Sequence, residues 1–409
     1  MEKPELLAPA GSFEKAKVAF MYGADAVYCG TGQLSLRSRA EVDDNSLEKT
    51  IEYAHSIGKK VYAAINIYAP DKAYEDIKSQ VQMLNKLAVD AIIASDGGVI
   101  ETIQEIAPDI PIHISTQANT LSAHSAKFWY KNGAKRVILS REMNKNDIKY
   151  LIDNIPQGLE TEIFIHGAIC WAYSGRCYLS DFMSGRNANL GDCSQSCRWA
   201  YNMYIEEKQN PGNLMPVQED ENGTYVLSSK DLCLIKEIPE IVDMGINSLK
   251  IEGRLKSEYY LASVVNAYRN AIDDYINNPD NYDYKKYEKE LEKVKTRDLT
   301  TFFFNDKENR DFQEFAGKQY NQNYEYGGQV QEYNEDKSII KVGNRLKVGD
   351  RMEIIIPNKI EVEEFTINKL WDSETDEEIE FVNPGKLGQT VKMHLPIKCE
   401  NGWLIRRKR

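Results

Sequence analysis

The chain has 409 residues with 51 basic and 63 acidic side chains, so its formal net charge is −12. That length can supply one large domain and a smaller one with cores that need no disulfide staples, and the acidic balance argues against broad electrostatic capture of nucleic acid or membrane. Because no run of about 18 apolar residues and no cleavable leader is evident, we expect a cytoplasmic protein without a membrane partner, whose seven cysteines serve metal binding or catalysis.

Short β-branched or apolar runs alternate with amphipathic helical stretches over the first two thirds of the chain, which is typical of repeated βα units. The runs are residues 5–10, 26–30, 60–66, 91–96, 112–116, 136–140, 162–166 and 248–253. Eight such units predict an α/β fold, a (β/α)8 barrel of the TIM type, which typically needs about 250 residues. We assign this barrel to residues 1–275; a doubly wound sheet is the alternative.

The carboxyl ends of the predicted strands carry polar side chains, and barrel enzymes place their function at these ends. Any one of these side chains could equally be a helix cap. The set is Asn66, Asp96, Thr116, Arg141, Glu142, His166, Lys250, Glu252 and Arg254. We take His166 and Glu252 as candidate catalytic residues, although a hydrogen-bonded structural imidazole fits His166 about as well as a proton shuttle.

A cysteine-rich insertion, residues 167–233, interrupts the regular spacing after the seventh predicted strand. It contains Cys170, Cys177, Cys193, Cys197 and Cys233. Dispersed thiolates suit a [4Fe–4S] cluster, for which we take Cys170, Cys177, Cys193 and Cys233 as ligands. Zinc favours closely spaced pairs such as Cys193 with Cys197, and is the less favoured metal; reduced, unliganded thiols are the third option.

The last part of the chain differs in pattern from the barrel. Residues 276–323 read as a charged helical linker, and short strands punctuated by glycine and valine over 324–409 predict a small antiparallel β-barrel domain. Phosphate contacts come from local Lys and Arg rather than from net charge, although basic ends are also common on solvated surfaces. The candidate RNA-binding residues are Arg345, Lys347, Arg351, Arg406 and Arg407.

Four segments carry a family resemblance: residues 8–30, 166–201, 227–235 and 248–273. They resemble peptidase family U32, the collagenase-like proteases. The family label implies proteolysis, whereas better-understood relatives imply oxygen insertion, and the length and tail of this chain resemble the tRNA 5-hydroxyuridine modification branch. One family pattern places cluster ligands on Cys170, Cys177, Cys193 and Cys233, and a second uses Cys193 with Cys197. The chain departs from the family at Phe302, where relatives tend to have glycine.

The resemblance implies prephenate-dependent hydroxylation of the tRNA wobble uridine by a protein with a [4Fe–4S] cluster. Guanidinium forks suit carboxylates, so four cationic residues are candidates to bind a small organic acid. They are Arg37, Arg141, Lys250 and Arg254. A collagenase-like peptidase is the second hypothesis, although the sequence has no HExxH helix, nucleophile elbow or P-loop. A non-catalytic RNA-binding protein is the third, and a paralogous or homo-oligomeric partner stays open.

Overall fold

The computed structural model describes most of the chain: residues 2–31, 34–35, 41–170, 172–199, 203–206, 208–209, 211–212, 214–217, 229–294, 297–305, 323–385 and 388–409. The chain forms two compact units. The first consists of Met1–Phe20, Asp25–Leu255 and Arg297–Tyr320, and the second of Met21–Ala24, Lys256–Thr296 and Asn321–Arg409. Within the described ranges, no helix combines the length and the apolar character needed to cross a membrane.

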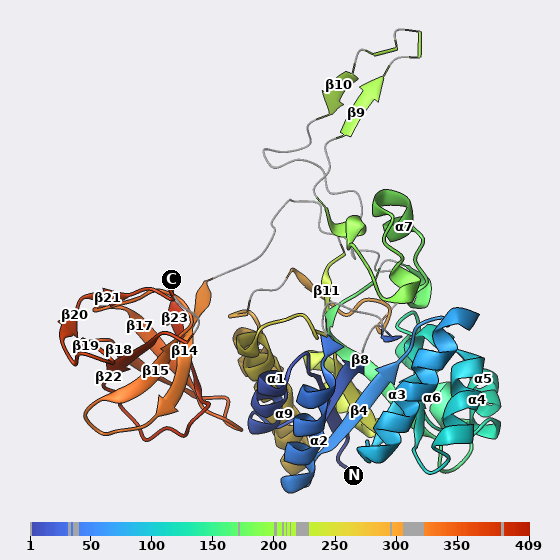
Figure 1. Ribbon diagram of the computed structural model, residues 1–409, viewed down its shortest axis with the longest axis horizontal. Coiled ribbons are helices and arrows are strands. Elements are labelled where there is room, and N and C mark those ends of the chain that lie inside the picture. The colour runs from blue at the N-terminus through green and yellow to red at the C-terminus, as the bar shows by residue number, and fades with distance from the viewer. Residues whose placement is uncertain are drawn as a thin grey trace. The chain divides into compact units, whose positions relative to one another are not determined.

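The first unit is built on a closed ring of parallel strands (Figure 1). In order around the ring they are β1 (Glu5–Pro9), β2 (Ala26–Thr31), β4 (Lys60–Ile65), β5 (Ala91–Ala94), β6 (Ile112–Ile114), β7 (Ala134–Ile138), β8 (Glu160–Ala168) and β12 (Ser248–Ile251). Strand β12 pairs in parallel with both β1 and β8, which closes the ring. The predicted (β/α)8 barrel is therefore confirmed, and the doubly wound sheet is excluded because such a sheet has two free edges.

Amphipathic helices surround the ring: α1 (Phe13–Met21), α2 (Asp44–Ser56), α3 (Tyr74–Lys86), α4 (Gly97–Ile106), α5 (Ala123–Lys131), α6 (Lys145–Asp153) and α8 (Ile238–Asp243). Helix α3 shows why they form, since Ile77, Val81 and Leu84 recur at helical spacing and are buried. Polar residues that end one strand often begin the next helix. Asp96 caps α4 by accepting hydrogen bonds from the amides of Gly98 and Val99, so this strand-end residue has the structural role of a cap.

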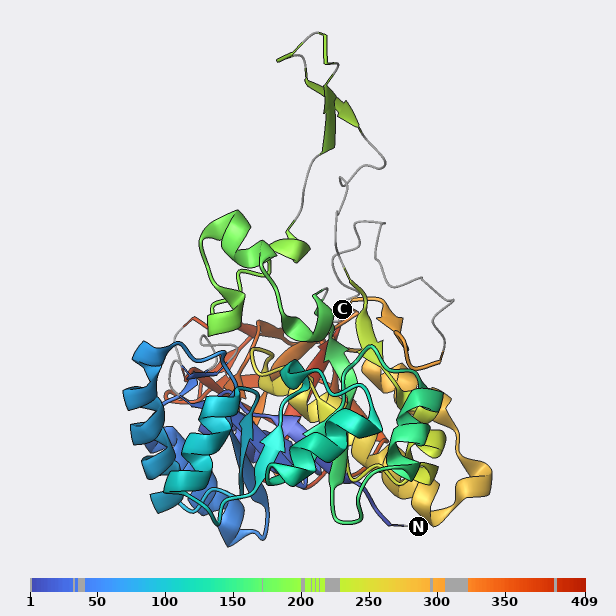
Figure 2. The same cartoon turned by 90° about the vertical axis from the view of Figure 1, so that its right-hand side faces the viewer.

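The insertion leaves the barrel at β8 and returns beside it. It holds the short helix α7 (Leu179–Ser184) and the hairpin of β9 (Met203–Glu206) and β10 (Leu214–Val217), and it ends in β11 (Asp231–Cys233). Strand β11 runs antiparallel to β8, with Cys233 opposite His166. Figure 2 shows the insertion, in green, projecting from one end of the barrel. Two short strands complete this sheet: β3 (Glu41–Val42), beside β2, and β13 (Leu299–Thr300), beside β11.

The second unit combines helices α9 (Glu258–Asn277) and α10 (Tyr284–Leu291) with an antiparallel sheet. The order of the sheet is β18 (Val362–Thr366), β17 (Arg351–Ile355), β23 (Leu404–Lys408), β14 (Tyr324–Glu332), β15 (Ser338–Val342), β22 (Thr390–Met393), β19 (Leu370–Asp372) and β20 (Glu378–Ile379). A separate pair joins β16 (Leu346–Lys347) to β21 (Phe381–Val382). The antiparallel domain is confirmed; between the two end strands β18 and β20, the described residues form no pairing that closes the sheet.

Candidate functional site

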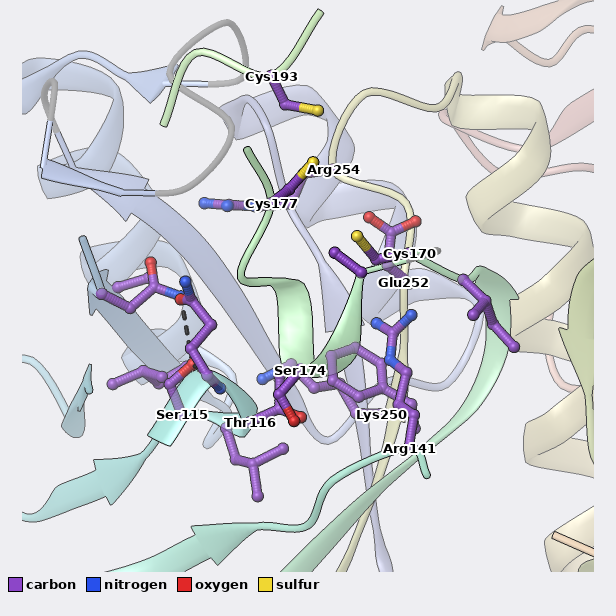
Figure 3. Close-up of a pocket in the computed structure, with 18 of the residues that line it drawn as sticks. Ser115, Thr116, Arg141, Cys170, Ser174, Cys177, Cys193, Lys250, Glu252 and Arg254 are labelled. Carbon is purple, nitrogen blue, oxygen red and sulfur yellow. Dashed lines mark hydrogen bonds between the residues drawn. The ribbon is translucent and has the colours of Figure 1, made fainter. Parts of the chain in front are cut away.

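A pocket of about 150 Å³ opens at the carboxyl ends of the barrel strands. Its floor is apolar, with Ala64 from β4, Ile93 from β5 and Ile138 from β7, while most of its polar residues come from the segments that follow the strands and Lys250 comes from β12 itself. Figure 3 shows Ser115 and Thr116 on one side of the pocket, Arg141 and Lys250 on the other, and three cysteines above them. The location agrees with the general rule for barrel enzymes.

The charged side of the pocket carries three of the predicted carboxylate-binding cations. Arg141 donates to the carbonyl of Ala168 at 2.7 Å, and its guanidinium carbon lies 3.7 Å from the centre of the Phe164 ring. Lys250 donates to the carboxylate of Glu162 at 2.9 Å. Arg254 donates to the Ser35 hydroxyl at 3.2 Å. The backbone and aromatic contacts fix the direction of these cations before any ligand binds.

Lys250 is nearly solvent-free, with 3% of its surface exposed. Burial lowers the pKa of its ammonium group, and the neighbouring carboxylate of Glu162 opposes that shift. Glu162 in turn also accepts from Arg136 at 3.1 Å, so one buried carboxylate serves two cations. Because Arg136 also pairs with Glu5 and Glu160, the carboxylate of Glu162 remains available as the counter-ion of Lys250.

The opposite side of the pocket has no charged group among the described residues that form it. Asn66, Ser115, Thr116 and Gln117 supply amide and hydroxyl groups there. The Asn66 amide donates to the Ser115 hydroxyl at 3.3 Å, and the Thr116 hydroxyl donates to the carbonyl of Leu139 at 3.3 Å. This side suits an uncharged ligand that can exchange hydrogen bonds.

Gln117 was not among the residues that the sequence singled out. It is 2% exposed, and neither Oε1 nor Nε2 has a hydrogen-bond partner within the described residues. The only signal in the sequence is its place two residues after the IHIS run, because a glutamine in such a turn is otherwise ordinary. Burial without a partner is the feature that sets it apart, and only the structure reveals it.

Four cysteines of the insertion share a second cavity, of about 160 Å³. Cys170, Cys177, Cys193 and Cys197 line it, and the first three of these also line the main pocket. Burial raises the pKa of the Cys197 thiol, Arg198 opposes the shift, and the three neighbouring cysteines reinforce it. Cys233 lies apart on β11 and lines neither cavity. The predicted ligand set of Cys170, Cys177, Cys193 and Cys233 thus stays a prediction, and Cys197 is the cysteine that shares the second cavity with the first three.

The donor chemistry of these cysteines fits the expected cluster, since four thiolates are the ligands that a [4Fe–4S] centre takes. Among the described residues, however, no three Cys, His, Asp or Glu side chains are arranged closely enough to hold a metal ion. The thiols thus face one cavity in a more open arrangement than a bound metal requires.

The two candidate catalytic residues lie in different surroundings. Glu252 lines the pocket, whereas His166 lies on β8 with 1% exposure and is not among the residues that line it. The His166 carbonyl accepts from the amide of Glu252 at 2.9 Å, so the histidine links β8 to the segment after β12. The structure brings Glu252 to the site but not the His166 side chain. Arg37 lies outside the described residues.

Arg406 does not have the exposed position that RNA binding needs. Its side chain is 0% exposed and pairs with Glu353 and Glu290, so its charge is compensated inside the second unit. Arg407 pairs with Glu325 and, at 3.1 Å, with Asp350. Because the Arg406 side chain is buried against these two carboxylates, it is not available for the phosphate contact that the sequence predicts.

The other basic candidates of the second unit are exposed: Arg345, Lys347 and Arg351. The guanidinium carbon of Arg345 lies 4.6 Å from the centre of the Phe381 ring, and this phenyl ring is 45% exposed. An exposed arginine beside an exposed aromatic ring provides both charge and a stacking face.

Phe302 stands where relatives tend to have glycine, and the structure shows what its side chain does there. Its φ is +51°, in the left-handed region that glycine adopts without strain. The Phe302 side chain lines the pocket, and its ring packs edge-on against Phe303 with 4.5 Å between centres. In this chain a phenyl ring therefore forms part of the pocket wall that a glycine would leave open.

The fold and site together define a TIM-type barrel protein with a cysteine-bearing insertion over its pocket and a separate antiparallel β domain. The chain belongs to peptidase family U32: the model named "Peptidase family U32" matches residues 11–314, and the "Peptidase family U32 C-terminal domain" matches residues 322–406.

Curated relatives cover most of the chain. It is 39% identical to "tRNA hydroxylation protein P1" of Bacillus subtilis, over 92% of this chain and 89% of that protein. It is 38% identical to "tRNA hydroxylation protein P" of Escherichia coli, over 87% of each chain. A third relative, "23S rRNA 5-hydroxycytidine C2501 synthase" of E. coli, is 34% identical over 66% of this chain and 40% of its own length.

Proposed function

We propose that this chain is an RNA-modifying hydroxylase that converts the wobble uridine of tRNA to 5-hydroxyuridine with prephenate as co-substrate. One observation carries the proposal: a single pocket has a cationic side that suits an organic acid and an uncharged side that suits a nucleobase. Relatives named for tRNA hydroxylation support the choice of reaction and of RNA.

The organic acid would occupy the cationic side. Arg141, Lys250 and Arg254 line the pocket together with the carboxylates of Glu142 and Glu252, so three cations and two carboxylates face the ligand, while Glu162 pairs with Lys250 from outside the lining. Prephenate is a dicarboxylate, and two carboxylates can share three cations of fixed direction. Glu252 is the pocket carboxylate placed to accept a proton from a substrate.

A [4Fe–4S] cluster would be held by Cys170, Cys177 and Cys193, with Cys197 as the fourth ligand in place of Cys233. When bound, the cluster would supply either redox chemistry or a rigid roof for the pocket. Three of these cysteines form part of the pocket wall, so binding of a cluster by their thiols would also affect the shape of the substrate site.

The RNA would present an unstacked uridine to the barrel, because an enzyme that modifies a base must take it out of the stack. Arg345, Lys347 and Arg351 in the second unit are the exposed cations that we propose for phosphate contacts, with Phe381 as a stacking face. Arg406 is excluded from this surface by its burial.

Neither rival hypothesis gains a supporting contact in the pocket. A serine or cysteine peptidase needs a nucleophile paired with a base, and the described residues that line the pocket include no histidine. A non-catalytic RNA-binding protein gives no reason for buried cations beside a row of cysteines.

The test is nucleoside mass spectrometry of tRNA from a strain that lacks the gene. We expect loss of 5-hydroxyuridine and its derivatives, and recovery on expression of the intact chain or of the control Lys149→Gln, an exposed residue of α6. The variant Arg254→Gln should not restore the nucleoside, and in vitro it should raise the KM for prephenate. Unchanged 5-hydroxyuridine in the deletion strain would refute the proposal.

A further inference from the structure

The amide of Gln117 is a buried hydrogen-bonding group with nothing to bond to among the described residues. Its backbone is firmly held, since the Gln117 carbonyl accepts from Tyr68 Oη at 2.8 Å and from Arg176 at 3.1 Å. A polar group that is buried without a partner costs free energy, so a position of this kind in a pocket points to a ligand that supplies the missing bonds.

The surroundings of Gln117 define what that ligand can be. The neighbouring side chains Asn66, Ser115 and Thr116 are uncharged, and the apolar floor includes Ile93 and Ile138. Arg176 does not line the pocket, so a charged group would lack a counter-ion among the described lining residues on this side, whereas a flat, neutral ring with polar atoms on its edge would not need one. A carboxamide offers one donor and one acceptor side by side, which matches a neighbouring acceptor and donor on such an edge.

We propose that Gln117 binds the imide edge of the substrate pyrimidine, with Oε1 accepting from N3–H and Nε2 donating to one of the carbonyl oxygens beside it. This inference rests on the proposed function, which supplies the base. It also orients that base: the C5–C6 bond lies on the side of the ring away from N3, so C5 points from Gln117 toward the charged side of the pocket. Gln117 is thus a substrate-binding residue that selects which ring edge faces the reaction.

The test couples a change in the protein to a change in the base. The full chain and its Gln117→Leu variant are compared on anticodon stem–loops that carry uridine, 4-thiouridine or 2-thiouridine at the target position. Sulfur is a weaker acceptor than oxygen, so wild type should lose activity with the analogue whose carbonyl Gln117 reads. The leucine side chain of the variant cannot make that bond, and the same analogue should cause the variant no comparable loss.

With unmodified uridine we expect Gln117→Leu to lower kcat/KM by about 5- to 30-fold, which corresponds to one or two hydrogen bonds of about 1 kcal/mol each. Most of the loss should appear in KM. Gln80→Leu is the matched control, because Gln80 also has a buried amide nitrogen without a described partner but does not line the pocket. Gln117→Glu keeps the acceptor, removes the donor, and should also lose activity.

A binding measurement separates this inference from the proposed function. Wild type should bind a stem–loop with uridine more tightly than one with an abasic target site, and Gln117→Leu should bind the two nearly equally. If wild type discriminates but leaves the uridine unmodified, only the proposed function fails. The assignment of Gln117 is overturned if wild type hydroxylates the uridine and the kcat/KM of Gln117→Leu stays within twofold of the wild-type value. It is also overturned if each thiouridine lowers the activity of wild type and of Gln117→Leu by the same factor.

Discussion

Replacement of Arg406 by methionine should destabilise the second unit without affecting the pocket. The guanidinium group is wholly buried and donates to Glu353 and to Glu290, both at 2.7 Å. Methionine keeps much of the apolar stem and removes the charge. The variant therefore isolates the contribution of a buried cation between two carboxylates.

The magnitude follows from what remains after the substitution. Removal of one partner from a buried ion pair costs about 3–5 kcal/mol when the other charge is left alone. Here Lys293 stays within 3.1 Å of Glu353 and 2.5 Å of Glu290, so the two carboxylates share one remaining cation. We therefore expect a loss of about 2–3 kcal/mol in the free energy of unfolding of the second unit.

The assay combines urea unfolding with hydrogen–deuterium exchange of peptides from β17 and β23, which report directly on this sheet. Arg351→Met, at an exposed position of β17, is the control and should change stability by less than about 0.5 kcal/mol. Adding Glu353→Gln to Arg406→Met should recover part of the loss, because Lys293 then neutralises one carboxylate instead of two. Equal stability of Arg406→Met and the control would refute the reasoning.

The remaining predictions concern pH, the cysteines, the pocket wall and RNA. Burial would raise the pKa of Glu353, but Arg406 and Lys293 outweigh this effect and lower the pKa in the folded protein. The stability that these ion pairs contribute is therefore present above the ordinary carboxyl pKa and is lost as the pH falls through the folded pKa. Denaturation measured from pH 6 to 3 should show a smaller loss of stability in Arg406→Met than in wild type. Cys197→Ser should lower the iron content after reconstitution more than Cys233→Ser does, and equal losses would contradict the grouping of the thiols. Phe302→Gly should relieve about 1 kcal/mol of backbone strain yet raise KM by opening the pocket wall, as steady-state kinetics will show. Arg351→Ala should reduce the salt dependence of tRNA affinity by about 0.7 in the log–log slope per lost single-strand phosphate contact, and an unchanged slope would remove it from the RNA surface.

The barrel could be predicted because its strands are buried on both faces. The five residues VYAAI of β4 are all buried because helices cover one side of the strand and the barrel core the other, and polar Lys60 and Asn66 mark the ends of the run. Closure of the ring was an inference from the number of units, since nothing in the sequence states that β12 pairs with both β1 and β8. Strand β11 was missed because its residues Asp231, Leu232 and Cys233 form no apolar β-branched run like that of the equally short β6.

The site was predicted in part, and the failures have a common physical origin. Arg141, Lys250, Glu252 and Arg254 could be placed because a parallel strand delivers its last residues to one end of a barrel. The partners of Arg406 lie 53 and 116 residues away in the sequence, so a terminal cluster of basic residues looked solvated when one member was buried. Spacing likewise cannot tell which four of the five cysteines line one cavity, because the turns between them decide it.

The antiparallel pairing of β11 with β8 brings the two ends of the insertion together at the barrel. Gly167 lies opposite Leu232 and Ala168 opposite Asp231, so the chain departs and comes back at the same point of the barrel. The entropic free-energy cost of closing such a loop depends only weakly on its length and rises by about 0.6 kcal/mol for each doubling. The segment with the cysteines therefore starts and ends at one point of the barrel, and a change in its length between β8 and β11 should cost little closure entropy.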